Sequence, residues 1–213
     1  MDFNGLLVGL GNPGSQYQGT RHNMGFMALE ALLEGLPRLA GASVEPLPGV
    51  KFQCRLWRCS LPGSKMPWLA AMPQTFMNLS GDSVQPLMAW YKLSPQKLLV
   101  IHDELDLEPG RIKLKSGGGI AGHNGLKSIV QRLGTQDFYR LRIGVGRPPD
   151  KDNVISWVLG RFPSAERALA EASLKEATEA VLCFAAQGPT KAANQYNGKK
   201  SPVLNETSVR DKN

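Results

Sequence analysis

The sequence predicts an α/β fold: a single globular domain with a mixed, largely parallel, twisted sheet flanked by helices. Short apolar runs, which are typical of buried strands, alternate along the chain with segments whose apolar residues recur at helical spacing. Hydrophobic residues make up 42% of the 213 positions, which is enough for one sizeable core. We expect the domain to span residues 1–197 and residues 198–213 to form a polar, disordered C-terminal tail.

The first third of the chain predicts a strand, a helix and a hairpin. An apolar run at residues 6–8 ends in glycines, which indicates a buried strand. Apolar residues at helical spacing predict a helix near residues 23–35. Residues 52–60 and 68–72 have the composition of strands, and the Leu61-Pro62-Gly63 turn between them predicts a hairpin.

The middle of the chain predicts a helix followed by a central strand. The helix carries apolar residues at Val84, Leu87, Met88 and Tyr91. Pro86 would break the interior of this helix, but it is harmless in the first turn if Ser83 is the N-cap. The continuous apolar run at residues 98–101 indicates a strand that is covered on both faces.

Two further strands have one cationic face each. Residues 111–115 alternate strictly between cationic and apolar side chains. Residues 139–145 alternate too, which places Arg140 and Arg142 together on one side. A helix at residues 124–133 is expected to connect these strands.

A long C-terminal helix is the last predicted element. Its apolar positions are Leu174, Ala177, Val181 and Phe184. Ser164 is the expected N-cap, and Gly188 followed by Pro189 ends the helix.

The net charge of +7 is concentrated in one segment. Residues 110–147 contain the bases Arg111, Lys113, Lys115, Lys127, Arg132, Arg140, Arg142 and Arg147. Asp137 is the only acid there, so the segment carries 8 − 1 = +7, and the remaining 17 bases and 17 acids cancel. Such a segment on a neutral body favours a docking surface for a polyanion over a merely solvated face.

Several classes of protein are excluded or disfavoured. No apolar run is long enough to cross a membrane, and no secretory signal is visible, so we expect a cytoplasmic protein without a membrane partner. Cys54, Cys59 and Cys183 lack metal-type spacing and are expected to be reduced, buried thiols. The acidic stretch at residues 102–106 has no second ligand cluster to complement it, so we predict no metal site.

Residues 9–14 match the G-x-G-x-x-G pattern of dinucleotide-binding proteins. That motif needs a helix that opens inside the glycines, whereas the helical pattern here begins only near Asn23. The acid expected about twenty positions further on would be Glu30 or Glu34, and both fall inside a helix. We therefore reject a nucleotide-dependent oxidoreductase and expect no cofactor.

Five polar residues are candidates for a site. Asn12, Asn78 and Asp103 follow predicted strands, and His22 and Asn124 lie near the start of predicted helices. A histidine can act as a general base, an aspartate can fix its tautomer, and asparagine amides can donate to an oxyanion. Each residue also has a purely structural explanation, because asparagine is common in turns and a single histidine is usually structural. Sequence alone does not decide between these alternatives.

Several motifs together carry a family resemblance. They are VGLGNPG at 8–14, Tyr17, TRHNMG at 20–25, PQTFMNLSG at 73–81, HDELDL at 102–107, GGGIAGHNGLK at 117–127, RLRIGVG at 140–146 and VLG at 158–160. The chain resembles the bacterial-type peptidyl-tRNA hydrolases over roughly residues 5–197. These enzymes hydrolyse the ester that joins a peptide to the 3′ end of tRNA.

The resemblance implies the following catalytic and tRNA-binding residues. His22 is the base that activates water, Asp103 orients His22, and Asn12 helps to place the water or the ester. Lys115 and Arg142 match the family's cationic clamp on a tRNA phosphate.

The resemblance also implies how the peptide is held. Asn78 and Asn124 hold its main chain, and Tyr17 and Phe76 line the cleft near the 3′ end. The family uses no metal or cofactor and is usually monomeric. The rival hypothesis is a catalytically inactive RNA-binding or splicing-type relative, which the joint presence of the candidate residues disfavours.

Overall fold

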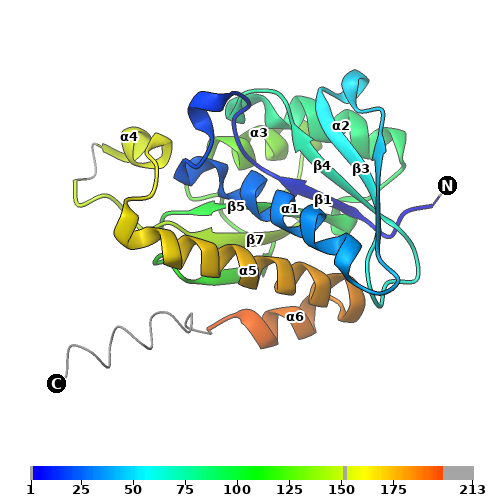
Figure 1. The fold of residues 1–213 in the computed structure, drawn as a ribbon. Helices are drawn as coiled ribbons and strands as arrows, with labels where there is room; N and C mark the ends of the chain where they lie inside the picture. The colour runs from blue at the N-terminus through cyan, green and yellow to red at the C-terminus, as the bar shows by residue number, and fades with distance from the viewer. Residues whose placement is uncertain (1, 151–152, 199–213) are drawn as a thin grey trace.

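The computed structural model describes residues 2–150 and 153–198 (Figure 1). A seven-stranded sheet forms its centre, with the strand order β2-β3-β4-β1-β5-β7-β6. The strands are β1 Leu6–Gly9, β2 Ser43–Leu47, β3 Cys54–Ser60, β4 Trp68–Pro73, β5 Leu98–Glu104, β6 Ile112–Ser116 and β7 Tyr139–Gly144. The central strands β4, β1, β5 and β7 are parallel, whereas β2, β3 and β6 pair antiparallel with their neighbours. The mixed sheet agrees with the predicted fold class, and β3 and β4 form the predicted hairpin.

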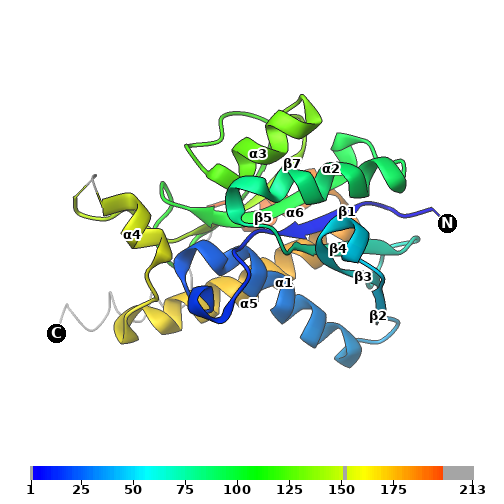
Figure 2. The same ribbon diagram turned by 90° about the horizontal axis from the view of Figure 1, so that it is seen from above.

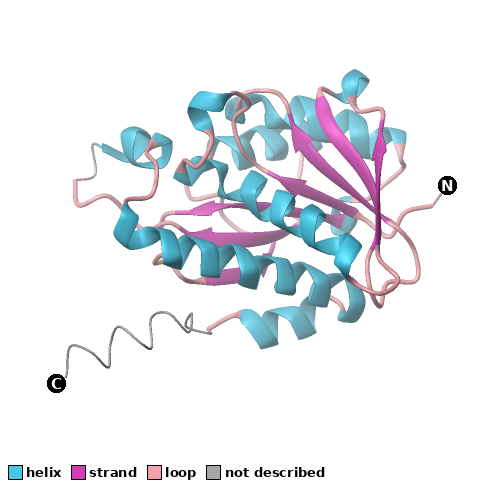
Figure 3. Cartoon of the chain, viewed as in Figure 1, coloured by secondary structure: helices cyan, strands magenta, loops and turns pink. Residues whose placement is uncertain are grey.

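Helices cover both faces of the sheet (Figures 2 and 3). On one face lie α1 Met24–Gly35, α5 Ser164–Gln187 and α6 Pro189–Tyr196, and on the other lie α2 Ser80–Trp90 and α3 Asn124–Leu133. The short helix α4 Val154–Leu159 stands apart, beyond one end of the sheet. Short 3₁₀ helices occupy Ser15–Tyr17, Arg21–Asn23, Leu36–Arg38, Val50–Phe52, Met77–Leu79 and Pro95–Lys97.

Two hydrophobic cores lie on opposite faces of the sheet. In β1, Leu7 belongs to the core under α1, α5 and α6, whereas Leu6 and Val8 belong to the core under α2 and α3. All seven residues of β5 are buried. A strand covered on both faces must be apolar on both, which explains the continuous apolar runs of β1 and β5.

The predicted N-cap of α2 was wrong. The helix begins at Ser80 rather than after Ser83, so Pro86 lies in its interior. The Gly81 N–H in the first turn donates to Ser128 Oγ of α3 at 2.9 Å. The N-cap residue, Leu79, has no side chain that could accept a hydrogen bond. The Ser128 hydroxyl of the neighbouring helix therefore accepts the bond from the first turn. Pro86 removes one hydrogen bond within the helix.

The predicted cap of α5 was also wrong, by one position. Pro163 occupies the N-cap position without a side-chain cap, and Ser164 is the first helical residue. Gly188 ends α5 as expected, but Pro189 then starts α6, because a proline is well tolerated in a first turn. Strand β2 and helices α4 and α6 were not predicted from the sequence.

Other predictions concern the termini and the thiols. Of the predicted tail, residues 199–213 lie outside the described residues. None of the helices in the described ranges is both long and apolar enough to span a membrane.

Cys54, Cys59 and Cys183 are free and buried, as expected. Burial raises the pKa of Cys54 to about 11 and that of Cys59 to about 12, so both thiols stay protonated at neutral pH.

Candidate active site

Candidate site residues gather at the carboxyl edge of the parallel strands. Asn12 follows β1, and Asp103 lies inside the end of β5 rather than after it. His22 lies in the turn that precedes α1, and Asn124 is the first residue of α3. Because parallel strands end at the same edge of a sheet, residues far apart in the chain meet there.

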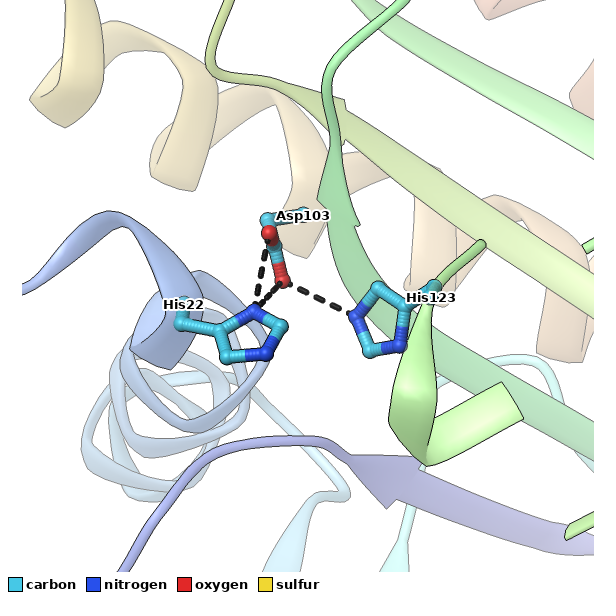
Figure 4. Close-up of side chains that lie close together, drawn as sticks. All are labelled: His22, Asp103 and His123. Atoms are coloured by element: carbon cyan, nitrogen blue, oxygen red, sulfur yellow. Dashed lines mark hydrogen bonds and ion pairs between the residues drawn. The ribbon is translucent and has the colours of Figure 1, made fainter. Parts of the chain in front are cut away.

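Asp103 is hydrogen-bonded to two histidines (Figure 4). His22 Nδ1 lies 2.9 Å from Asp103 Oδ1 and 3.0 Å from Oδ2. His123 Nε2 lies 3.0 Å from Asp103 Oδ1. The side chain of Asp103 is only 2% exposed, and those of His22 and His123 are 11% and 7% exposed. The three side chains point toward one another from a turn, a strand end and a helix start.

The hydrogen bonds assign the tautomers of both rings. His123 Nδ1 accepts from the backbone N–H groups of Gly125 and Leu126, at 3.1 and 3.3 Å, and so caps α3. Its proton must then be on Nε2, from which it donates to Asp103. His22 Nδ1 also donates to Asp103, which leaves the lone pair of His22 Nε2 available as a proton acceptor.

The cluster keeps Asp103 ionised. Burial by itself opposes ionisation, but His123 and His22 outweigh it and lower the pKa of Asp103 below its ordinary value. A buried carboxylate that accepts two N–H groups is a fixed negative charge. It can therefore orient His22 and stabilise the imidazolium that forms when His22 takes a proton.

His102, the histidine that does not contact the Asp103 side chain, is structural. It is buried, its Nδ1 donates to the backbone carbonyl of Asp103 at 2.7 Å, and its ring packs edge-on against His123. Burial and the neighbouring His123 lower its pKa to about 3, so it is neutral at physiological pH.

A metal would have to compete with the hydrogen bonds of the cluster. His22, Asp103 and His123 each offer one ligand atom within 4.8 Å of the others. Both ring nitrogens that face Asp103 carry the protons of hydrogen bonds, and a metal ligand must be unprotonated. Protons thus explain the arrangement without an ion, and the absence of a metal site stays a prediction.

Asn12 is locked by its neighbours. Its backbone N–H donates to Asn23 Oδ1 at 2.9 Å, and Asn23 Nδ2 donates back to its carbonyl at 3.0 Å. The Met77 N–H donates to Asn12 Oδ1 at 2.8 Å. Since the oxygen of the amide is occupied, Nδ2 is the group that Asn12 can offer to a substrate.

Two cavities flank these residues. One of about 280 Å³ is lined by His22, Asp103, His123 and Asn124 together with Val154, Ile155 and Val158 of α4. Asn12 lines a separate cavity of about 390 Å³ between α1 and the end of β4. The His22–Asp103–His123 cluster thus faces an apolar wall that α4 supplies.

Arg21 holds this wall in place. Its buried guanidinium lies 3.9 Å from the centroid of the Trp157 ring of α4. Arg21 Nη1 donates to the Arg161 carbonyl at 3.1 Å, and Nη2 pairs with Glu166 at 2.9 Å. Arg21, the residue before His22, therefore connects the turn that carries His22 to α4 and to the start of α5.

Tyr17, Phe76 and Asn78 lie at the surface. Phe76 is 55% exposed, Asn78 is exposed and Tyr17 is half-buried. Within the described ranges, no hydrogen bond joins their side chains to the His22–Asp103–His123 cluster. Met77, between Phe76 and Asn78 in the chain, connects these two residues to the site, because its N–H donates to Asn12 Oδ1 and its sulfur packs closely on Gly125. The structure therefore places Asn78 at the surface, not in hydrogen-bond contact with the His22–Asp103–His123 cluster.

The basic segment is more neutralised than its sequence indicates. Arg111, Arg132, Arg142 and Arg147 form ion pairs with Glu108, Asp82, Glu104 and Asp106. Arg142 Nε lies 2.7 Å from Glu104 Oε2. In the part of the chain that the structure describes, Lys113, Lys115 and Lys127 are exposed and have no ion pair. The free positive charge of the segment is therefore mainly that of its lysines.

Comparison with known proteins identifies the family. The peptidyl-tRNA hydrolase family model matches residues 6–203. A peptidyl-tRNA hydrolase of Nitratidesulfovibrio vulgaris (strain DSM 19637 / Miyazaki F) is 50% identical over 200 residues, covering 94% of this chain and 99% of that protein. The chain belongs to the peptidyl-tRNA hydrolase family.

Solved structures of the family have the same fold. The crystal structure of peptidyl-tRNA hydrolase from Acinetobacter baumannii superposes with a TM-score of 0.84 and 39% identity, covering 94% of this chain and 98% of that one. A further family member, from Desulfovibrio desulfuricans, is 50% identical over 206 residues, covering 95% of this chain and 89% of that protein. Both the family resemblance and the fold class predicted from the sequence are confirmed.

For this family member, sequence reasoning missed three contributors to the site. His123 directly precedes the predicted helix at residues 124–133, a position where histidine is an unusual cap, and the sequence does not predict its bond to Asp103. Asn23 and Arg21 flank His22 in the chain, yet no local pattern reveals that they bind Asn12 and α4. Their partners become visible only when the strands are assembled.

Proposed function

We propose that this chain hydrolyses the ester bond between a peptide, or an N-blocked amino acid, and the 3′ end of tRNA, and so recycles tRNA from prematurely released peptidyl-tRNA. One observation carries the proposal: His22, whose Nε2 has no hydrogen-bond partner among the described residues, is held by the ionised Asp103 in a cavity, in a chain that belongs to the peptidyl-tRNA hydrolase family. A water, a base and charge stabilisation are sufficient for this reaction.

In the proposed mechanism, His22 Nε2 takes a proton from water as the water oxygen attacks the ester carbonyl. Asp103 stabilises the resulting imidazolium. When the tetrahedral intermediate collapses, the bond to the ribose oxygen breaks and His22 returns the proton to that oxygen. The products are a tRNA with a free 3′-terminal ribose hydroxyl and a peptide carboxylic acid, which releases its proton to the solvent and becomes the carboxylate at neutral pH. General-base catalysis of this kind contributes about 10²–10⁴-fold.

Asn12, Asn78 and Asn124 would place the substrate. Asn12 Nδ2 is free to donate to the water or the ester carbonyl. Asn78 and Asn124 are exposed, so their amides can bind the peptide main chain, which makes recognition independent of the peptide sequence. Tyr17 and Phe76 offer accessible aromatic rings on which nucleotides near the 3′ end can stack.

Lys115 and Arg142 would bind a tRNA phosphate. Lys115 is exposed, and within residues 2–150 and 153–198 it has no ion pair. Arg142 donates to Glu104 through Nε, and its two amino groups have no hydrogen-bond partner in the same ranges. We further propose that the protein acts as a monomer in the cytoplasm, with tRNA as its partner and without metal or cofactor.

The decisive experiment measures peptide release from an N-blocked aminoacyl-tRNA by the wild type and by His22→Ala. We expect hydrolysis by the wild type and its collapse in His22→Ala, with the Kd for tRNA unchanged because the variant keeps the basic surface. A folded wild type that binds tRNA without hydrolysing it would instead favour the inactive RNA-binding relative.

A further inference from the structure

Arg140 lies next to the proposed phosphate site but is not exposed. In the register of β6 and β7, Lys115 stands opposite Arg140 and Lys113 stands opposite Arg142. Residues paired in this way share one face of the sheet, so four cations converge there. Arg140 is 2% exposed, whereas both lysines are exposed. Its charge therefore cannot be explained as a solvated surface group.

The guanidinium of Arg140 binds a loop rather than an acid. Nη1 donates to the Gly119 carbonyl and Nη2 to the Gly118 carbonyl, each at 2.7 Å. Burial and the neighbouring Arg142 lower the pKa of Arg140. Among residues 2–150 and 153–198, no carboxylate forms an ion pair with Arg140. Moving a cation out of water costs free energy. The buried guanidinium of Arg140 therefore needs an explanation other than the formation of the sheet.

The loop supports Lys115. Gly117 and Gly118 have φ of 58° and 83°, in the left-handed region that favours glycine. A Cβ on Gly118 would lie 2.8 Å from Lys115 Nζ and 2.9 Å from Cε, so the lysine side chain lies directly along this glycine. The Gly117 N–H is bonded to the Phe138 carbonyl at 3.0 Å, which fixes the start of the loop.

We propose that Arg140 is a positioning residue for tRNA binding: it clamps the glycine loop at residues 117–119, and this loop seats Lys115 beside Arg142 for a phosphate. The inference deepens the proposed function and rests on it. A guanidinium suits this task because its planar fork reaches two carbonyls at once, whereas an ammonium is a compact point donor.

Arg140→Lys tests the clamp, because lysine keeps the charge but loses the two-pronged geometry. We expect KM for N-blocked aminoacyl-tRNA to rise about tenfold, the effect of one charge-assisted hydrogen bond. We expect kcat and its pH profile to stay unchanged. With a short aminoacyl oligonucleotide that lacks the phosphates of the tRNA body, the variant should match the wild type.

Two glycines provide a matched pair of variants, one inside the loop and one outside it. Gly118→Ala should reproduce the effect of Arg140→Lys, because its methyl group would displace Lys115 and its φ is positive. Gly35→Ala, in α1 and outside the loop, should behave like the wild type, because a Cβ there meets nothing within 4 Å. This pair also tests the inference if Arg140→Lys fails to fold.

A double-mutant cycle with Lys115→Ala separates positioning from an independent contribution. If Arg140 acts through Lys115, the double variant should bind tRNA no more weakly than Lys115→Ala alone. Additive losses, an equal loss with the short substrate, or equal effects of the two glycine variants would each overturn the inference. Direct measurement of Kd for tRNA keeps the cycle informative even if the wild type proves not to hydrolyse the ester.

Discussion

The buried cluster around Asp103 and the cationic face of β6 and β7 are built in different ways. The cluster joins residues 81 and 20 positions from Asp103, and each hydrogen bond there depends on one orientation. The cationic face arises from two neighbouring strands whose alternation alone gathers the charges. The cluster is almost closed to solvent, whereas Lys113 and Lys115 are exposed.

This difference teaches which property each region controls. His22 can accept a proton from water only in the correct orientation and tautomer. Substitutions in the cluster should therefore lower the turnover rate. An exposed charge acts through a field that salt screens, so changes on the cationic face should affect binding and its salt dependence. Arg140 shares a property with each region: it is buried like the cluster, but its proposed role is to position Lys115 on the exposed cationic face.

The largest effect is expected for Asp103→Asn, which tests whether the cluster acts on turnover. The amide keeps the shape of the side chain but removes the charge that holds the His22 tautomer. We expect kcat to fall by about 10⁴-fold, as when the aspartate of a histidine-containing triad is replaced in this way. Steady-state kinetics and tRNA binding should be measured together. An affinity loss with kcat intact would contradict the division between the two regions.

A smaller effect is expected for Lys115→Ala, which tests the cationic face. We expect KM for the tRNA substrate to rise about tenfold and the slope of log KM against log salt to fall by about 1, since one phosphate contact is lost. The matched control is Lys97→Ala, an exposed lysine at the opposite, amino end of β5. An unchanged salt slope, or the same change in the control, would remove Lys115 from the phosphate site.

The smallest effect concerns the pH dependence of stability, through His102. Its folded-state pKa of about 3 lies below the unfolded value near 6.5, so the unfolded chain binds a proton that the folded chain does not. Stability is fully present above pH 6.5 and falls as pH drops toward 3, by about 1 kcal/mol per pH unit from this group. Urea titrations at pH 6 and 5 should show a shallower loss for His102→Gln than for the wild type. Equal losses would mean that His102 is not kept neutral by the fold.

The sequence by itself determined most of the elements and pointed to the main candidate site residues. Periodicity and composition located every strand of the sheet except β2, and the helices α1, α2, α3 and α5, because burial on one or both faces imposes a local pattern. The motifs pointed to His22 and Asp103, and the structure places these two in contact. The sequence also located the two basic strands, because the alternation of cationic and apolar side chains is visible residue by residue.

Only the tertiary structure decided the partners. Helix α2 starts at Ser80 without a side-chain cap from its own N-cap residue, and Ser128 of α3 accepts the hydrogen bond of the Gly81 N–H, so the predicted local cap at Ser83 is wrong. Arg140 and Arg142 are two positions apart on one strand face, yet one clamps a loop and the other pairs with Glu104. His123 both caps α3 and donates to Asp103. Sequence periodicity records which face a side chain occupies, whereas a hydrogen-bond partner depends on strand register and helix packing between distant segments.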